Sequence, residues 1–523
     1  MVADPVVSPL KALLGLPAAQ PIGTTSSSPY SGSPTFDEVP LHVAGQTPPL
    51  NAFAIVDSGS DDYVHYGRII HGQEENPRAD PTRLQQNRAY AVGGRDPRPG
   101  DRAPHVTRII TVQIMGEIYV ETGLLAIRDP GELPQTGRPV YLLDAGMIPV
   151  LLNLPTSPDD GLDLGTCEAG GSAVTLRLPV EALARHLTIV GKTGVGKSHA
   201  AAVLIEECVR LGIPVFAFDV LKDLINATET LGGRNYQAGA RDFRIPYSII
   251  GLTEFLAFIP NLTRDQQEIV AAAYDAVYAE ALRELEDAGG ISVDVQRLMD
   301  EITAVGSAAG QDAVAARAAR RVTAFLSRST LLTTTTQDWL NELRAKPMIN
   351  VFVGHLPQRQ RNLVVAATAR MLQILRRRDK VPPFELVLDE AHLFLPSDHT
   401  ESPSTSVVRE MVQTARHDGI GITLLTQSPS SMDRRAFVTC NTRLVFALDP
   451  EDMRLVAGHL GDLPQAVIDR IPRMRRGRCI LSSAMDVLRH SVQLDVRQRE
   501  TPGGAPTPNL AKEAKTWRAT MMS

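Results

Sequence analysis

The sequence predicts a multidomain protein in which a small N-terminal β-barrel precedes an α/β domain that carries a helical insertion. Three observations lead to this prediction. Short apolar runs separated by Gly, Pro and Asp fill residues 41–165, strand-like and helical segments alternate over 166–500, and an Ala-rich stretch interrupts that alternation at about 261–345. The chain has 523 residues, which is enough for about two to four domains of ordinary size.

The composition is that of a water-soluble protein with a large core, because 43% of the residues are hydrophobic and 21% are charged. The net charge of −6 argues against a uniformly basic protein that coats nucleic acid. Any contact with nucleic acid must therefore come from a local basic patch, or from a symmetric assembly that concentrates one.

Cysteine spacing and hydropathy favour a cytoplasmic location. The four cysteines lie far apart and form no C-x-x-C pair, which argues against a zinc ribbon and a secreted disulfide scaffold. They are Cys167, Cys208, Cys440 and Cys479. No run approaches the roughly 18 consecutive apolar residues of a membrane span, and the N-terminus lacks the pattern of a signal peptide.

The two ends of the chain differ in composition from the parts between them. Residues 1–40 are rich in Pro, Ser, Gly and Thr and are predicted to be a flexible tail. Residues 501–523 begin similarly and then have the composition of a short helix, which would be either a frayed tail or a segment docked on a neighbouring molecule. Residues 41–165 show no helical period and predict a small barrel or sandwich.

The α/β domain is predicted to contain a largely parallel sheet, because apolar runs alternate with helical segments. The candidate strands are "HLTIVG", "PVFAFD", "MINVFVG", "FELVLDE", "GITLLTQ" and "TRLVFALD". The segment at about 261–345 has amphipathic helical spacing and no chemical motif.

A phosphate-binding loop follows the first of these strands. The stretch "GKTGVGKS" matches G-x-x-x-x-G-K-[ST], with an apolar strand before it and an Ala-rich helix after it. Its residues are Gly191, Lys192, Thr193, Gly194, Val195, Gly196, Lys197 and Ser198. The glycines let backbone N–H groups face the phosphates of ATP, Lys197 is expected to reach the β- and γ-phosphates, and Ser198 is expected to ligate Mg²⁺.

A second apolar strand, "FELVLDE", ends in two carboxylates. Asp389 is the expected Mg²⁺ partner, and Glu390 is placed to polarise the attacking water. His392 is interpreted as a helix-start residue that contacts the neighbouring loop, in preference to a direct catalytic role. With the phosphate loop, this strand predicts a RecA-like P-loop domain.

The letters D-E-A-H at 389–392 also label a class of RNA helicases. Asp389 lies 192 residues (389 − 197) after Lys197, about twice the separation in those enzymes. They also contain a second RecA-like domain, and the residues after Asp389 are too few for one. The sequence therefore argues against an RNA helicase, and any second half of a motor must come from another subunit.

Three further polar residues are candidates for the catalytic site. Gln427 ends the strand "GITLLTQ" and is expected to sense the γ-phosphate. Arg416, at the end of the preceding helix, is either an arginine finger for a neighbouring subunit or part of a surface salt bridge. Arg185, just before the phosphate-loop strand, is a second candidate for the same role.

Together these motifs resemble the HerA branch of the HerA/FtsK ATPases over residues 41–500. The resemblance is carried by "ARHLTIVGKTGVGKS", "VFAFD", "LVLDEAHLFLP", "ARHDGIGITLLTQSPSSMD", "CNTRLVFAL" and "RIPRMRRGRCILSS". One departure follows Asp219, where the family often has Asp-Pro-His-Gly or Asp-x-Lys-Gly and this chain reads "DVLKDL", without the glycine.

The resemblance implies a homohexameric ring that uses ATP and Mg²⁺ to translocate double-stranded DNA. It also implies a partner, either a NurA-like nuclease in DNA end processing or a defence effector such as a sirtuin-like protein. By resemblance, Arg416 and Arg185 act across the subunit boundary. The alternative is an ATPase scaffold that assembles and gates a partner effector, with translocation secondary. A conjugation-type DNA pump is disfavoured because it predicts a membrane segment.

Two basic runs are candidates for lining the pore of such a ring, and each is equally compatible with a solvated face or a salt-bridge network. The first run contains Arg376, Arg377, Arg378 and Lys380, and the second contains Arg473, Arg475, Arg476 and Arg478.

Overall fold

The computed structural model describes residues 8–27, 32–43, 47–75, 107–169, 172–239, 242–336, 339–397, 403–503 and 517. The chain forms two compact units. One unit comprises Met1–Leu154, Thr166–Thr175 and Gly461–Arg470, and the other comprises Pro155–Gly165, Leu176–Leu460 and Ile471–Ser523. The segments 166–175 and 461–470, which the sequence assigned to the ATPase domain, therefore belong with the N-terminal unit.

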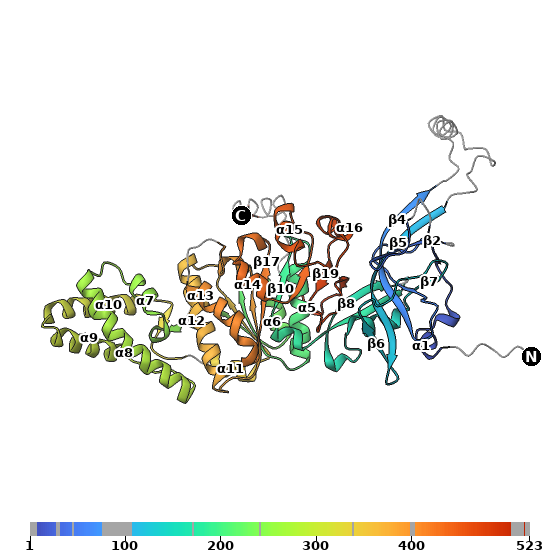
Figure 1. The fold of residues 1–523 in the computed structure, drawn as a ribbon. Coiled ribbons are helices and arrows are strands. Elements are labelled where there is room, and N and C mark those ends of the chain that lie inside the picture. The colour runs from blue at the N-terminus through green and yellow to red at the C-terminus, as the bar shows by residue number, and fades with distance from the viewer. Residues whose placement is uncertain are drawn as a thin grey trace, which may run out of the picture. The chain divides into compact units, whose positions relative to one another are not determined.

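The N-terminal unit is a six-stranded barrel. Its strands are β1 (Gly23–Thr25), β2 (Glu38–Val43), β3 (Phe53–Val56), β4 (Tyr63–Glu75), β5 (Thr107–Glu121) and β7 (Pro139–Leu142). They follow the order β2-β1-β7-β3-β4-β5, and pairing of β2 with β5 closes the barrel (Figure 1). Strand β6 (Leu124–Arg128) extends the hairpin from β5. Alternating side chains such as Val39, Leu41, Val112 and Val140 fill the core.

The predicted flexible tail at 1–40 is wrong for the part of it that the structure describes. Residues 8–27 form the helix α1 (Pro9–Leu13), a 3₁₀ turn (Leu16–Ala18) and β1. Leu10, Leu14 and Leu16 are buried, and β1 pairs with both β2 and β7. The Pro- and Ser-rich composition did not indicate this structure. Three buried leucines and a three-residue strand are enough to fix the segment on the barrel.

The second unit is built on an eleven-stranded sheet in the order β12-β15-β11-β16-β17-β10-β18-β19-β20-β8-β9. The six predicted strands are β10 (Leu187–Val190), β11 (Val215–Asp219), β15 (Met348–Phe352), β16 (Phe384–Leu388), β17 (Ile420–Thr426) and β18 (Thr442–Val445), all parallel. Strand β12 (Arg234–Gln237) is parallel to β15. Beyond β18, the added strands are β19 (Arg478–Ser482), β20 (Val492–Val496), β8 (Gly161–Ala169) and β9 (Ser172–Pro179). The predicted domain boundary at 165/166 falls inside β8, where the chain also passes from one compact unit to the other.

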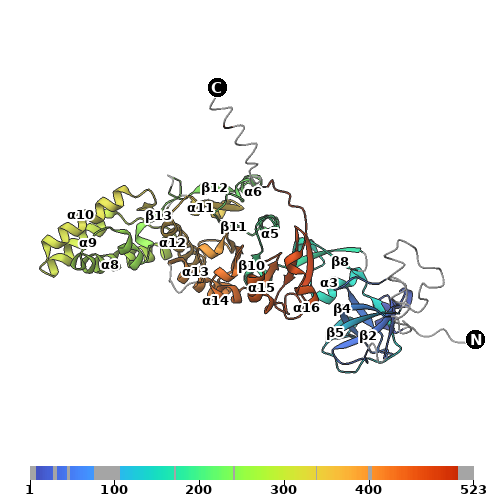
Figure 2. The ribbon, with the colours of Figure 1, turned by 90° about the horizontal axis from the view of Figure 1, so that it is seen from above.

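Helices cover both faces of the parallel part of the sheet. Figure 2 shows α5 (Lys197–Arg210), α6 (Ile225–Thr230) and α11 (Trp339–Ala345) on one side, with α12 (Gln358–Arg377), α13 (Pro403–Thr414) and α14 (Arg434–Thr439) on the other. The remaining helices include α3 (Ile148–Leu152), α4 (Glu181–Ala184), α15 (Pro450–Ala457) and α16 (Gln465–Ile468). Within the described ranges, no helix is both long and apolar enough to cross a membrane.

Between β13 (Ile245–Pro246) and β15 the chain is mostly helical. The helices are α7 (Leu252–Phe258), α8 (Arg264–Ala288), α9 (Val295–Ala308) and α10 (Asp312–Arg328), and the short strand β14 (Leu332–Thr333) pairs with β13. Figures 1 and 2 both show α8, α9 and α10 packed side by side. Thr263 begins α8 with a capping box, and Gly289 ends it in the left-handed conformation.

A buried carboxyl group lies in the middle of the sheet. Glu385 of β16 is 1% exposed, and its Oε1 accepts a hydrogen bond of 2.6 Å from the Thr423 hydroxyl of β17. Burial raises the pKa of Glu385 to about 8. A Cβ on Gly421 would lie 1.8 Å from Glu385 Oε2, so the glycine makes room for this side chain.

The raised pKa of Glu385 predicts that the protein loses stability as pH rises. Between the usual carboxyl pKa and about 8, the folded state keeps the proton and the unfolded state releases it. Each pH unit in this window then removes up to about 1.4 kcal/mol from the free energy of unfolding. Glu385→Gln removes this contribution while keeping an oxygen for Thr423. Urea unfolding at pH 6 and pH 8 should show a smaller pH-dependent loss for the variant than for the parent protein, and equal losses would contradict the assignment.

Candidate nucleotide-binding site

The residues predicted to bind nucleotide lie at one edge of the parallel sheet. The four strands β11, β16, β17 and β10 are consecutive neighbours, and their carboxyl ends meet at this edge. The loop Gly191–Ser198 follows β10, Asp389 and Glu390 follow β16, and Gln427 follows β17. The structure therefore brings together residues that are separated by more than 230 positions, such as Thr193 and Gln427.

The backbone of the phosphate loop depends on glycine at two positions. A Cβ on Gly191 would lie 2.6 Å from the Phe446 side chain that follows β18. Gly196 has a φ of 122°, which L side chains rarely adopt. Helix α5 begins directly after it, so the N–H groups of the first helical turn are available to a phosphate.

Polar side chains of the loop bond to one another and to the next strand end. Lys197 Nζ donates to the carbonyl of Lys192 at 3.0 Å, inside the loop that would hold a phosphate. The Thr193 hydroxyl donates to Gln427 Oε1 at 2.7 Å, which places the Gln427 amide against the loop.

The two carboxylates after β16 are almost fully buried. Asp389 is 6% exposed, and burial together with the nearby Asp219 and Glu390 raises the pKa of Asp389 to about 8. Glu390 is in the left-handed region with a φ of 49°, a conformation that costs about 1–3 kcal/mol outside glycine. Its Oε2 is buried and has no hydrogen-bond partner in the described structure. A buried, unsatisfied carboxylate oxygen of this kind can accept a hydrogen bond from a bound water.

His392 contacts the neighbouring strand end, in agreement with its interpretation from the sequence. Its Nδ1 lies 3.2 Å from the Thr426 hydroxyl of β17 and 3.4 Å from Glu390 Oε2. It therefore sits between the ends of β16 and β17, where it limits the positions open to the Glu390 side chain.

The loop after β11 keeps its turn without the family's glycine. Lys222 occupies the glycine position and adopts a φ of 65°. The Asp219 carboxylate stabilises the turn by accepting hydrogen bonds from backbone N–H groups, at 3.0 Å from Leu221, 2.7 Å from Lys222 and 3.1 Å from Leu224. This turn brings Asp223 to the phosphate loop, where its Oδ2 accepts a hydrogen bond of 2.7 Å from the Ser198 hydroxyl.

The arrangement fits a nucleotide phosphate with Mg²⁺. Burial lowers the pKa of Lys197, while Glu390, Asp389 and Asp223 act in the opposite direction, so three carboxylates surround one ammonium group. In the described part of the chain, no three His, Cys, Asp or Glu side chains are arranged to hold a metal ion by themselves. Mg²⁺ prefers such incomplete sites, because substrate phosphates and waters supply its remaining ligands.

The two candidate arginine fingers lie at the opposite edge of the sheet. Arg185 precedes β10, and Arg416 lies in a 3₁₀ turn just before β17. Since β17 has seven residues, the two edges are about 20 Å apart. Arg185 forms an ion pair with Asp486, whereas Arg416 is exposed and has no hydrogen-bond or ion-pair partner among the described residues. Neither arginine reaches the phosphate loop of its own chain.

The two basic runs have different surroundings. In the first run every cation has an intramolecular partner: Arg376, Arg377, Arg378 and Lys380 contact Asp379, Asp418, Glu286 and the carbonyl of Asp287, respectively. The second run approaches the phosphate loop, because the Gly477 N–H donates to the Val195 carbonyl at 2.9 Å. Its Arg475 and Arg478 form ion pairs with Asp495.

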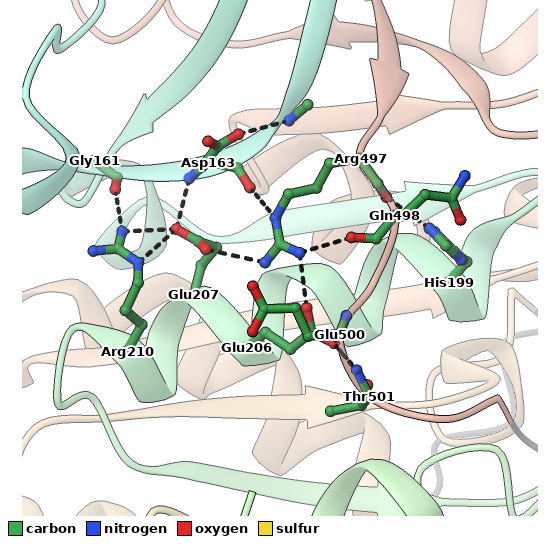
Figure 3. A network of polar contacts seen from close by, with 11 residues as sticks. Gly161, Asp163, His199, Glu206, Glu207, Arg210, Arg497, Gln498, Glu500 and Thr501 are labelled. Carbon is green, nitrogen blue, oxygen red and sulfur yellow. Dashed lines mark hydrogen bonds and ion pairs between the residues drawn. The ribbon is translucent and has the colours of Figure 1, made fainter. Parts of the chain in front are cut away.

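The segment after β20 fastens to the phosphate-loop helix α5 (Figure 3). The Arg497 guanidinium contacts Glu206 at 2.9 Å and Glu207 at 3.0 Å, and His199 Nε2 lies 2.8 Å from the Arg497 carbonyl oxygen. Glu206 also accepts hydrogen bonds from Thr501. Burial alone would raise the pKa of Glu206, but these hydrogen bonds and Arg497 hold it below its usual value. Thr501, the first residue of the predicted C-terminal tail, is 4% exposed and is therefore held against α5.

Removing the guanidinium is predicted to destabilise the second unit. Arg497→Ala leaves the buried Glu206 and Glu207 without their shared cation, a change that typically costs about 3–5 kcal/mol. Thermal or urea unfolding should show this loss. Gln498→Ala is the matched control, because its side chain is exposed and only its backbone carbonyl bonds to Arg497. Equal stability of the two variants would show that the ion-pair network does not hold this segment.

Parts of the chain are similar to known proteins. Residues 162–372 match the family model described as "Helicase HerA, central domain". The chain is 21% identical over 361 residues to the DNA double-strand break repair helicase HerA of Sulfolobus acidocaldarius, which covers 66% of this chain and 71% of that protein. The corresponding HerA of Saccharolobus solfataricus is 22% identical over 354 residues, covering 64% and 69%.

Among solved structures, VirB4 of Thermoanaerobacter pseudethanolicus is 16% identical, with a TM-score of 0.48, covering 65% of this chain and 97% of that one. The family match spans the phosphate loop, its helix α5 and strand β15, and the curated matches cover about two thirds of the chain. Residues 162–372 therefore match the HerA central domain, the chain is similar to HerA helicases over about two thirds of its length, and it is an ATP-hydrolysing P-loop enzyme.

Proposed function

We propose that this protein is a homohexameric ATPase that translocates or unwinds double-stranded DNA. The observation that carries the proposal is the division of catalytic groups between the two edges of the sheet. The phosphate loop and carboxylates lie at one edge, and the unpaired Arg416 lies at the other. A ring in which each Arg416 meets the next subunit's phosphate loop would complete every site. The curated relatives named as DNA repair helicases support DNA as the substrate of the motor.

The roles of the site residues follow from their positions. Lys197 and the loop N–H groups hold the phosphates of ATP, and Ser198 and Asp389 hold Mg²⁺. Mg²⁺, when bound, neutralises charge on the phosphate oxygens. Glu390 orients the attacking water through Oε2, which has no hydrogen-bond partner among the described residues. Gln427, whose Oε1 accepts a hydrogen bond from Thr193, contacts the γ-phosphate. Arg416 and Arg185 stabilise the transferring group of the neighbouring subunit.

The proposed assembly works with a partner in the cytoplasm. By family, the partner is either a NurA-like nuclease in DNA end processing or a defence effector such as a sirtuin-like protein. Residues 261–345 are proposed to be a helical insertion in the RecA-like domain. The alternative function is an ATPase scaffold that gates such an effector, with DNA movement secondary.

Two substitutions separate nucleotide binding from turnover. Lys197→Ala should abolish ATP binding, since it removes the cation among three carboxylates. Glu390→Gln should bind ATP with nearly unchanged affinity and lose turnover by at least about 10²-fold. A fluorescent ATP analogue measures binding, and phosphate release measures turnover. Normal hydrolysis by Glu390→Gln would refute its assigned role.

The response to DNA distinguishes a motor from a scaffold. ATPase rate is measured with and without duplex DNA, each with and without the partner. A motor should hydrolyse ATP several-fold faster with duplex DNA, with a salt dependence typical of phosphate contacts. A rate that ignores DNA and responds only to the partner would favour the scaffold.

A further inference from the structure

We propose that Asp223 is a positioning residue that orients the Ser198 hydroxyl toward Mg²⁺, on a loop that Asp219 holds in shape. This inference rests on the proposed role of Ser198 as a magnesium ligand. It adds a residue outside the phosphate loop and the β16 strand end, the two motifs in which the sequence located the metal-holding groups.

The Ser198 hydroxyl has a single proton, and the direction of that proton decides whether the oxygen can bind a metal. A serine oxygen can give a lone pair to a metal only if its proton points elsewhere. Here the hydroxyl donates that proton to Asp223 Oδ2 at 2.7 Å, which leaves its lone pairs facing away from Asp223. A carboxylate is a strong acceptor for this proton, and it raises the electron density on the oxygen that would bind the metal.

Asp223 is held in place by the turn that follows Asp219. It lies four residues after Asp219, whose fully buried carboxylate caps the intervening turn. Asn350 of the neighbouring strand β15 lies 3.5 Å from the same carboxylate, which ties the turn to the sheet. The ammonium group of Lys222 rests 4.7 Å from the centre of the Phe352 ring, a contact that accompanies its left-handed backbone.

The same loop also contacts Asp389, the other residue proposed to hold Mg²⁺. The Val220 N–H donates to Asp389 Oδ2 at 3.3 Å. One turn, residues 219–224, thus touches Ser198 through a side chain and Asp389 through the backbone. In many metal sites, a second layer of groups bonds to the metal ligands and fixes their orientation. The turn has this geometry, because it bonds to both proposed ligands.

The experiment measures how Mg²⁺ strengthens the binding of a fluorescent ATP analogue. For Asp223→Ala we expect the Mg²⁺ concentration at half-effect to rise by about 10-fold or more, as for other outer-shell partners, while binding in EDTA changes by less than about two-fold. Asp223→Asn keeps an oxygen acceptor and should lose less. Glu229→Gln, which removes an exposed carboxylate from the adjacent α6, is the matched control.

A double-mutant cycle with Ser198→Ala tests the route of the effect. If Asp223 acts through Ser198, the double variant should be no worse than Ser198→Ala alone. Additive losses in the double variant would overturn the proposal. An Asp223→Ala variant with the same Mg²⁺ response as the control would overturn it too. Neither result would contradict the proposed ATP site. If Ser198→Ala itself keeps the parent's Mg²⁺ response, the magnesium assignment in the proposed function fails as well.

Discussion

The central constraint of this structure is the concentration of negative charge at the carboxyl edge of the parallel sheet. Because β11 and β16 are parallel neighbours, the turn after β11 and the end of β16 bring Asp223, Asp389 and Glu390 close to Lys197. Burial makes this charge expensive, which is why the pKa of Asp389 rises to about 8. In the proposed function, a bound nucleotide with its metal ion would add a cation here and fill the phosphate loop.

The surrounding structure holds this edge in a fixed geometry. On one side, Asp219 caps the turn that carries Asp223 to Ser198. On the other, the segment after β20 fastens to α5 through Arg497, so the helix behind the phosphate loop is tied to the sheet extension formed by β19 and β20. In the proposed ring, the arginines at the far edge come from the next subunit, since a parallel sheet cannot bring its two edges to one site within a single chain.

The sequence was informative where a local pattern has one physical meaning. The phosphate-loop position and the six parallel strands were predictable, because apolar runs ending in polar residues define one edge of such a sheet. The sequence did not indicate a role for Asp223, because the chain lacks the family's glycine in the turn that precedes it. Lys222 adopts the left-handed conformation at that position instead. The buried role of residues 8–27 and 497–503 was missed because composition alone does not show that Leu10 or Thr501 finds a partner far along the chain.

In the proposed ring, each ATP site is completed by an arginine from the next subunit. Co-assembly of Arg416→Ala subunits with Glu390→Gln subunits tests it directly, with ATP turnover measured across the mixing ratio. Every interface that joins an intact Glu390 to an intact Arg416 should be active, so the account predicts turnover above that of either parent, with a maximum at intermediate ratios. Turnover that only averages the two inactive parents at every ratio would contradict it.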